Sequence, residues 1–194
     1  MSTLTEQQQL FASLVEKGHN VYFGGIAGSG KTFLAKHVVT GIACTLYGCI
    51  PAQTIHSSVV IGQCRGTKEY LLSNVLSNEY CVGRSRSTEA LCINEISMLS
   101  KRWFQTINHV SQNICNSELA SGGLHVVAFG DFLQLTPVPS AIDDGRYAFQ
   151  SILWDATFPH QVILDENFHA KDDQELVNLL REFQKTSVAK SHWI

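Results

Sequence analysis

Residues Gly25–Thr32 read GIAGSGKT, and this short segment restricts the fold of the chain more than any other. It has the spacing G-x-x-x-x-G-K-[ST], in which backbone N–H groups and a lysine surround the phosphates of a nucleotide. The pattern is specific only where a strand precedes it and a helix follows it. Val21–Phe23 is a short, apolar, β-prone run, and an apolar-rich stretch extends from Phe33 to about Val39. We therefore predict a strand, a phosphate loop and a helix.

Strands and helices are predicted to alternate along the rest of the chain. Apolar runs predict strands at 90–93, 125–129 and 162–164, and helical spacing predicts helices at 4–17, 101–115 and about 173–183. Such alternation favours a three-layer α/β fold, in which a mainly parallel sheet is covered on both faces. A length of 194 residues suits one domain, so we expect residues 1–194 to form a single unit.

Composition excludes several classes of protein. No apolar run reaches the roughly 18 residues that a membrane span needs, and the N-terminus lacks a signal-peptide pattern, so we expect a soluble, intracellular protein without membrane contact. The six cysteines include no C-x-x-C pair, which argues against a zinc site and a disulfide framework. A net charge of -3 and a pI near 6.2 argue against a broadly basic surface, so nucleic acid would have to bind in a local groove.

The phosphate loop predicts the nucleotide contacts. Lys31 is expected to neutralise β- and γ-phosphate oxygens, and the hydroxyl of Thr32 to ligate Mg²⁺, while the loop glycines allow close approach of the backbone. The expected nucleotide-binding residues are Gly25, Ile26, Ala27, Gly28, Ser29, Gly30, Lys31 and Thr32.

Two further polar groups follow predicted strands. In P-loop hydrolases one acid of a pair helps to hold Mg²⁺ and the other orients the attacking water. Here the pair reads Asn94-Glu95, so Glu95 is suited to act on water, whereas Asn94 is neutral where a charged metal partner is expected. Gln134 follows the strand at 125–129 and should emerge at the same edge, near the γ-phosphate. A solvated loop acid at Glu95 and a plain turn at Gln134 remain alternatives.

Together these motifs resemble the PIF family of superfamily-one helicases, relatives of the RecD-like and Helitron helicases. The resemblance covers segments 4–34, 40–48, 53–59, 91–104, 122–139, 143–154 and 162–183. Its most specific part is GDFLQLTPV at 130–138, after NEISML at 94–99. It implies a RecA-like motor domain that couples ATP hydrolysis with Mg²⁺ to 5′-to-3′ unwinding of single-stranded or forked DNA. It also implies work in repair, recombination and telomere maintenance, in the nucleus or mitochondrion, as a monomer.

The resemblance also implies individual roles. Gln8 would read adenine, Glu95 would activate water, and Gln134 would sense the γ-phosphate, with Lys31 as the catalytic cation. The metal would be held by Thr32 and Asn94. The residues that would line the DNA track are Thr54, His56 and Ser57. Phe132, Phe149 and Trp154 are candidates for base stacking, although core packing is the interpretation that the sequence alone favours for each.

The chain departs from the family pattern at four places. Asn94 replaces the family's aspartate, and His169 replaces an arginine that contacts the γ-phosphate; an imidazole lacks the guanidinium fork. Only Phe33–Val39 separates the phosphate loop from TGIA, whereas a parallel crossover needs about a dozen residues. Either the helix continues to about Leu46 or one family strand is lacking. Because the chain ends at Ile194, before a second motor domain, we expect no unwinding by the isolated chain.

Three functional hypotheses remain open. The first is a helicase motor domain that still binds or slowly hydrolyses ATP. The second is a nucleotide- or DNA-binding module without catalysis, which we favour for the isolated chain because of Asn94 and His169. The third, an unrelated P-loop kinase or GTPase, is opposed by GDFLQLTPV.

Overall fold

The computed structural model describes residues 4–25, 29, 31, 34 and 66–164. Apart from Leu34, the predicted helices at 33–39 and 173–183, the short crossover before TGIA and the His169 segment lie outside the described residues. The two alternatives for this part of the chain, a helix that continues to about Leu46 or the lack of one family strand, therefore both stay open.

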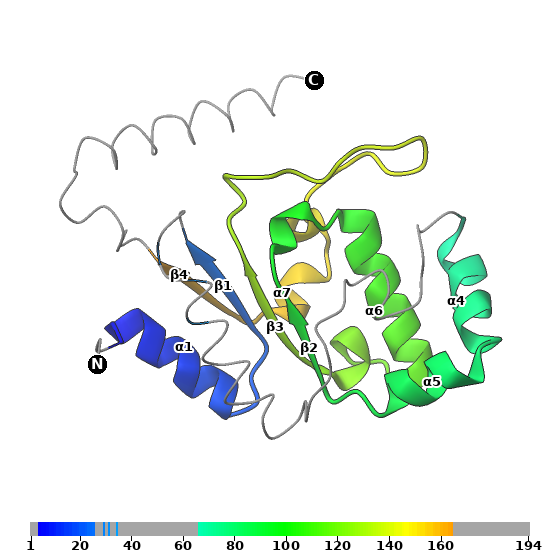
Figure 1. Cartoon of the computed structure of the whole chain (residues 1–194), viewed down its shortest axis with the longest axis horizontal. Helices are drawn as coiled ribbons and strands as arrows, with labels where there is room; N and C mark the ends of the chain where they lie inside the picture. Colours follow the sequence, from blue (N-terminus) through cyan, green and yellow to red (C-terminus); the bar gives the residue numbers. More distant parts are fainter. Residues whose placement is uncertain (1–3, 26–28, 30, 32–33, 35–65, 165–194) are drawn as a thin grey trace.

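A four-stranded parallel sheet forms the centre of the described structure (Figure 1). Its strands are β1 (Val21–Gly25), β2 (Ala90–Ile93), β3 (His125–Gly130) and β4 (His160–Leu164), in the order β2-β3-β1-β4. All three pairings are parallel. This confirms the predicted parallel sheet and each predicted strand.

Helices flank the sheet. The α-helices are α1 (Glu6–Glu16), α4 (Lys68–Leu76), α5 (Glu79–Arg86), α6 (Lys101–Cys115) and α7 (Trp154–Thr157). Three 3-10 turns, η1 (Ile96–Met98), η2 (Ala120–Gly123) and η3 (Ala148–Gln150), connect them to the strands. Figure 1 shows α1 on one side of the sheet and α6 with α4 and α5 on the other, which gives the three layers expected.

Each face of the sheet has its own hydrophobic core. On the α1 face, Phe11 packs against Phe23 and Phe129, with ring centroids 4.3 and 5.5 Å apart. On the other face, α6 packs Ile107 and Val110 against the sheet. Leu10 is exposed, because α1 turns its Phe11 and Val15 side toward the sheet.

The three candidate stacking aromatics have different environments. Trp154 is 4% exposed and packs against Tyr22, so core packing is confirmed there. Phe132 is partly buried and packs against the same core. Phe149 is 42% exposed and stacks on Tyr147 at 5.1 Å, so the expectation of core packing was wrong for it. It lies in the η3 turn, where only Ala148 faces the core.

The long loop after β3 is fastened to the start of α6. Ser100 caps α6 by accepting a hydrogen bond from the Trp103 N–H at 3.2 Å, and its hydroxyl donates to the buried carboxylate of Asp143. Asp143 also accepts a hydrogen bond from the Gly145 N–H at 3.0 Å. A cap of this kind contributes about 1 kcal/mol, and here it also fixes the loop beside the carboxyl edge of the sheet.

Candidate nucleotide site at the carboxyl edge of the sheet

The carboxyl ends of β1, β2 and β3 lie at one edge of the sheet because the three strands are parallel. Gly24 is in register with Gly130, and Ile93 with Ala128, so the segments after these strands start close together. The phosphate loop follows β1, Asn94-Glu95 follows β2, and Asp131 to Gln134 follow β3. Ligands of open α/β sheets bind at this edge.

Lys31 lies among oxygen atoms at this edge. Its ammonium group donates a hydrogen bond to the carbonyl oxygen of Gly25. Burial lowers the pKa of Lys31, while the negative charges of Asp131 and Glu95 act in the opposite direction. Lys31 and Glu95 are thus brought together as the sequence predicted, and Asp131 joins them. A partly buried cation of this kind is suited to receive phosphate oxygens.

Gly25 allows the phosphate loop to leave β1. A Cβ atom at this position would lie 2.7 Å from the hydroxyl oxygen of Ser29 and 2.9 Å from Cβ of Leu164. Ser29 itself is fully buried. Only glycine therefore permits this close approach of the loop, the end of β1 and the neighbouring strand β4.

Glu95 has an uncommon backbone conformation. Its φ and ψ angles are 55° and 50°, in the left-handed region that residues with a Cβ rarely adopt. The next two residues, Ile96 and Ser97, are fully buried and hold this turn in place, while the side chains of Asn94 and Glu95 are exposed. Strained backbone held by its surroundings is typical of functional sites.

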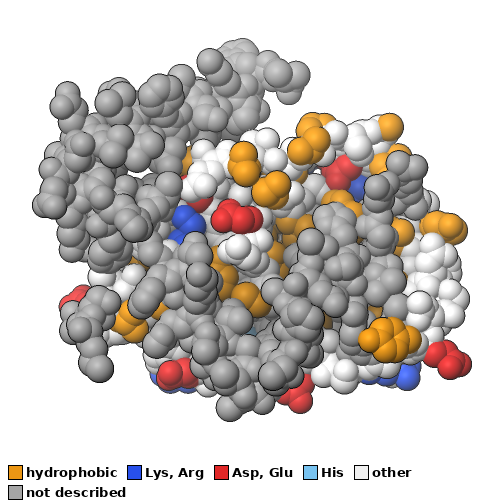
Figure 2. Space-filling model, viewed as in Figure 1, with side chains coloured by type: hydrophobic (Ala, Val, Ile, Leu, Met, Phe, Trp, Pro, Cys, Tyr) orange, Lys and Arg blue, Asp and Glu red, His pale blue; other side chains and the backbone are white. Residues whose placement is uncertain are grey.

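Gln134 is held by Asp131. Its side-chain amide donates a hydrogen bond to Oδ2 of Asp131 at 2.7 Å, and its backbone N–H donates to the carbonyl oxygen of Asp131 at 3.1 Å. The Gln134 side chain is exposed, whereas Asp131 is 4% exposed. Figure 2 shows hydrophobic side chains on the upper part of this face of the molecule. The segment after Asp131 has three exposed hydrophobic residues, Leu133, Leu135 and Val138.

Gln8 lies on α1 and is buried. Its side-chain oxygen accepts a hydrogen bond from the Thr5 N–H at 3.1 Å, while the Thr5 hydroxyl accepts one from the Gln8 N–H at 3.3 Å. This capping box fixes the first turn of the helix. The structure thus gives Gln8 a local role in helix capping, and adenine recognition stays a prediction.

Several predicted site residues lie outside the described residues, and their roles stay predictions. These are Ile26, Ala27, Gly28, Gly30 and Thr32 of the phosphate loop, and Thr54, His56 and Ser57 of the predicted DNA track.

Among the described residues at this edge, Asn94 and Glu95 have exposed side-chain oxygen atoms, the ligand type that Mg²⁺ prefers. Within the described part of the chain, no group of three or more His, Cys, Asp or Glu side chains could hold a metal ion. Mg²⁺ in phosphate sites usually needs only one or two protein oxygens, because substrate phosphates and waters complete its shell. Thr32 and Asn94 would supply such oxygens. Asn94 brings no charge, however, so the fit is electrostatically weaker than with aspartate.

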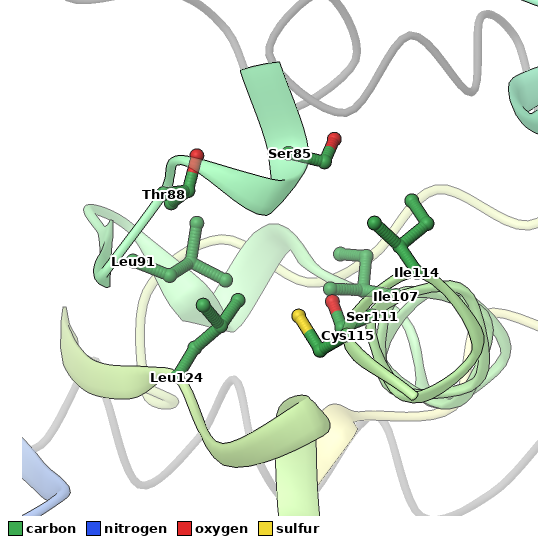
Figure 3. Close-up of a pocket in the computed structure, with 8 residues that line it drawn as sticks. All are labelled: Ser85, Thr88, Leu91, Ile107, Ser111, Ile114, Cys115 and Leu124. Atoms are coloured by element: carbon green, nitrogen blue, oxygen red, sulfur yellow. The ribbon is translucent and has the colours of Figure 1, made fainter. Parts of the chain in front are cut away.

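A cavity elsewhere in the structure is too small for a nucleotide. It has a volume of about 40 Å³ and lies between α5, α6 and the starts of β2 and β3. Figure 3 shows Leu91, Ile107 and Leu124 among the side chains that line it. Small-molecule sites have volumes of roughly 300–1,000 Å³. It also lies toward the amino ends of the strands, so it is separate from the candidate site.

Comparison with known protein families gives a clear result. A model of the family described as "PIF1-like helicase" matches residues 3–189. The chain belongs to the PIF1-like helicase family. The family resemblance noted in the sequence is thereby confirmed.

Curated relatives of this PIF1-like chain are longer proteins. "ATP-dependent DNA helicase PIF1" of Candida albicans is 30% identical over 207 residues, which cover 95% of this chain and 23% of that protein. The rat protein of the same name is 30% identical over 189 residues, covering 92% of this chain and 29% of that protein. The chain thus spans about a quarter of the length of these relatives.

Solved PIF1-like structures share the fold. The crystal structure of Pif1 helicase from Candida albicans matches with a TM-score of 0.86 and 27% identity, over 95% of this chain and 44% of that one. Bacteroides Pif1 in complex with ADP-AlF3 and single-stranded DNA matches with a TM-score of 0.74 and 29% identity, over 96% of this chain and 47% of that one. The predicted RecA-like fold is therefore confirmed.

Sequence reasoning missed Asp131 and Tyr22 as parts of this site. Asp131 is the first residue after β3, and its place in the GDFLQ motif was the signal available. Tyr22 gave no signal, because an aromatic residue in an apolar strand looks like core. Its hydroxyl donates a hydrogen bond to the carbonyl oxygen of Gly130 at 3.3 Å, directly before Asp131. Burial, assisted by the charge of Asp131, raises the pKa of Tyr22 and keeps its proton in place.

Proposed function

We propose that this chain is the nucleotide-binding motor domain of an ATP-dependent DNA helicase, with residues 1–194 forming one domain. ATP would bind with Mg²⁺ at the carboxyl edge of the sheet. In this proposal Lys31 contacts the phosphates, Glu95 orients the attacking water, and Gln134 senses the γ-phosphate. Thr32 and Asn94 would hold the metal, Gln8 would read adenine, and single-stranded or forked DNA would pass along Thr54, His56 and Ser57.

One observation supports this proposal above the others. Lys31, Glu95 and Gln134 each belong to a segment that follows a different strand; the charges of Glu95 and Asp131 both act on Lys31, and Gln134 donates a hydrogen bond to Asp131. Phosphoryl transfer needs a cation for the phosphates and a group that orients the nucleophile, placed together before the substrate arrives. A kinase or GTPase of another family would share the loop but not the GDFLQLTPV segment that carries Gln134.

The wider biology follows from the relatives and belongs to the same proposal. The curated relatives are named ATP-dependent DNA helicases, and a Bacteroides relative was solved with single-stranded DNA. DNA repair, recombination and genome maintenance in the nucleus or mitochondrion are the processes that such helicases suggest. No helix of the described residues is long and apolar enough to cross a membrane. We propose a monomer as the binding unit.

Asn94 favours a second candidate function, a module that binds nucleotide without hydrolysing it. A neutral amide in place of a carboxylate weakens the hold on Mg²⁺, whereas the phosphate contacts of Lys31 do not depend on it. The two candidates differ in turnover, so hydrolysis measured in the presence of single-stranded DNA separates them.

The test is a titration with a non-hydrolysable ATP analogue and Mg²⁺. We expect saturable binding by the wild-type protein and at least a tenfold loss for Lys31→Ala, since a charge-assisted contact contributes about 1.5–3 kcal/mol. Lys68→Ala is a matched control, because Lys68 is exposed on α4. Equal affinity of the wild type and Lys31→Ala would refute the proposed site. Glu95→Gln then tests turnover, which should fall while binding persists.

A further inference from the structure

Asp131 is a buried carboxylate at the candidate site that interacts with Gln134 and with Lys31. It lies at the end of β3, between the ends of β1 and β2, and is 4% exposed. Its Oδ1 accepts a hydrogen bond from the Leu133 N–H at 2.9 Å, and its Oδ2 accepts one from the Gln134 side chain at 2.7 Å. Its charge also acts on Lys31. A buried charge is tolerated only where it is paired and hydrogen-bonded, and these contacts meet that condition.

The ionised carboxylate decides which end of the Gln134 amide faces it. A carboxylate only accepts hydrogen bonds, and a glutamine amide has an accepting oxygen and a donating NH₂ group. The NH₂ group must therefore face Asp131, where it uses one N–H. The second N–H and the oxygen Oε1 of Gln134 remain for a ligand.

We infer that Asp131 is a positioning residue that fixes the orientation of the Gln134 amide and thereby sets how the site distinguishes a triphosphate from a diphosphate. This inference rests on the proposed function of the site. In this inference Asp131 acts on the nucleotide through Gln134.

The backbone around Asp131 is built to keep this orientation. The Tyr22 hydroxyl holds the carbonyl oxygen of Gly130, and the Gln134 N–H closes a tight turn onto the Asp131 carbonyl oxygen. The turn therefore has little freedom to rotate. A pre-oriented amide loses little conformational entropy when it binds the γ-phosphate. More of the contact's free energy then favours ATP over ADP.

Asp131→Asn tests the inference with almost no change in shape. An asparagine at this position offers one acceptor and one donor group, so it cannot accept from both the Leu133 N–H and the Gln134 NH₂. Keeping the Leu133 contact turns its NH₂ toward Gln134, whose amide must then reverse. Asp155→Asn is the matched control, because Asp155 accepts a hydrogen bond from the Gln161 side chain at 3.3 Å in an exposed pair outside the site.

The first readout is the Gln134 side-chain amide signal in a ¹⁵N NMR spectrum without nucleotide, assigned by its loss in Gln134→Ala. We expect one of its two protons to exchange slowly in the wild type, and the signal to shift in Asp131→Asn but not in Asp155→Asn. Two equally fast-exchanging protons in the wild type would overturn the inference, even if Asp131→Asn failed to fold.

The second readout is the ratio of affinities for a non-hydrolysable ATP analogue and ADP. We expect Asp131→Asn to reduce the preference for the triphosphate by about tenfold, like Gln134→Ala, with no further loss in the double variant. An unchanged ratio in folded Asp131→Asn beside a reduced ratio in Gln134→Ala would overturn the inference. A wild-type protein that binds neither nucleotide would instead refute the proposed function, and the NMR signal would still decide the orientation of Gln134.

Discussion

Gly130→Ala is a sensitive test of how the segments after β2 and β3 are joined. Gly130 ends β3, and a Cβ atom there would lie 3.0 Å from Cγ2 of Ile96, 3.1 Å from the Ile96 nitrogen and 3.2 Å from the Ser97 nitrogen. Carbon contacts are optimal at about 3.5–4.0 Å. Two of the three neighbours are backbone atoms, which cannot move away by a rotamer change.

The expected cost follows from this crowding. Ile96 and Ser97 are fully buried, so the η1 turn has no free space behind it and must shift as a unit. Overpacking of this kind costs about 1–3 kcal/mol. For a chain of this length, a destabilisation of about 2 kcal/mol lowers the Tm by roughly 4–8 °C. The same shift would displace Glu95, which directly precedes the turn.

Gly83→Ala is the matched control, and the opposite sign is expected for it. Gly83 lies within α5, and nothing is found within 4 Å of a Cβ atom at that position. Alanine in a helix interior is favoured over glycine by about 0.5–1 kcal/mol. Urea unfolding followed by circular dichroism would measure both variants. If Gly130→Ala proved as stable as the wild type, the close packing of β3 against η1 would be refuted.

Two further predictions concern charge. Burial raises the pKa of Cys92 from 9.0 to about 11, so the folded state keeps this proton longer than the unfolded state. The resulting stability is fully present below pH 9 and is lost as the pH rises through about 11, by roughly 3 kcal/mol at most. Between pH 7.5 and pH 10.5, the free energy of unfolding measured with urea should therefore fall less for Cys92→Ala than for the wild type. An equal fall in both proteins would contradict this. Asn94→Asp should increase, by about tenfold, the ratio of ATP-analogue affinities measured with and without Mg²⁺. The same ratio in the variant and the wild type would count against a metal position at residue 94.

The parts of the fold that the sequence predicted are those whose signal is local. The strands are short apolar runs, and α6 has strong helical spacing, so both were found. In α4 and α5 the apolar spacing is weak; Tyr70 and Tyr80 are exposed, and in α4 only Leu71 and Val75 are buried. These two helices were not predicted, because their stability comes from docking on α6 and not from their own pattern.

In the candidate site, too, the sequence predicted the features with a local signal and not those that depend on tertiary structure. The sequence predicted that Lys31, Glu95 and Gln134 would share one edge, since parallel strands place their carboxyl ends together. It did not predict Asp131 as the group between them, because a hydrogen bond over three residues depends on side-chain orientation. The strand order β2-β3-β1-β4 was also not predicted, although it places β3 between β1 and β2, so that Asp131 follows the central one of these three strands and its charge acts on Lys31.

Asn94 is neutral, so this edge carries one charge fewer than it would with an aspartate at that position. Glu95 has its left-handed conformation directly before the fully buried Ile96 and Ser97, whereas the side chain of Asn94 is exposed. Lys31 keeps the electrostatic support of Asp131 and Glu95. Packing of buried residues holds the backbone of this edge in place, whereas negative charge strengthens the binding of Mg²⁺. Loss of one carboxylate should therefore weaken Mg²⁺-dependent turnover while leaving phosphate binding in place, which is why binding and hydrolysis must be measured separately.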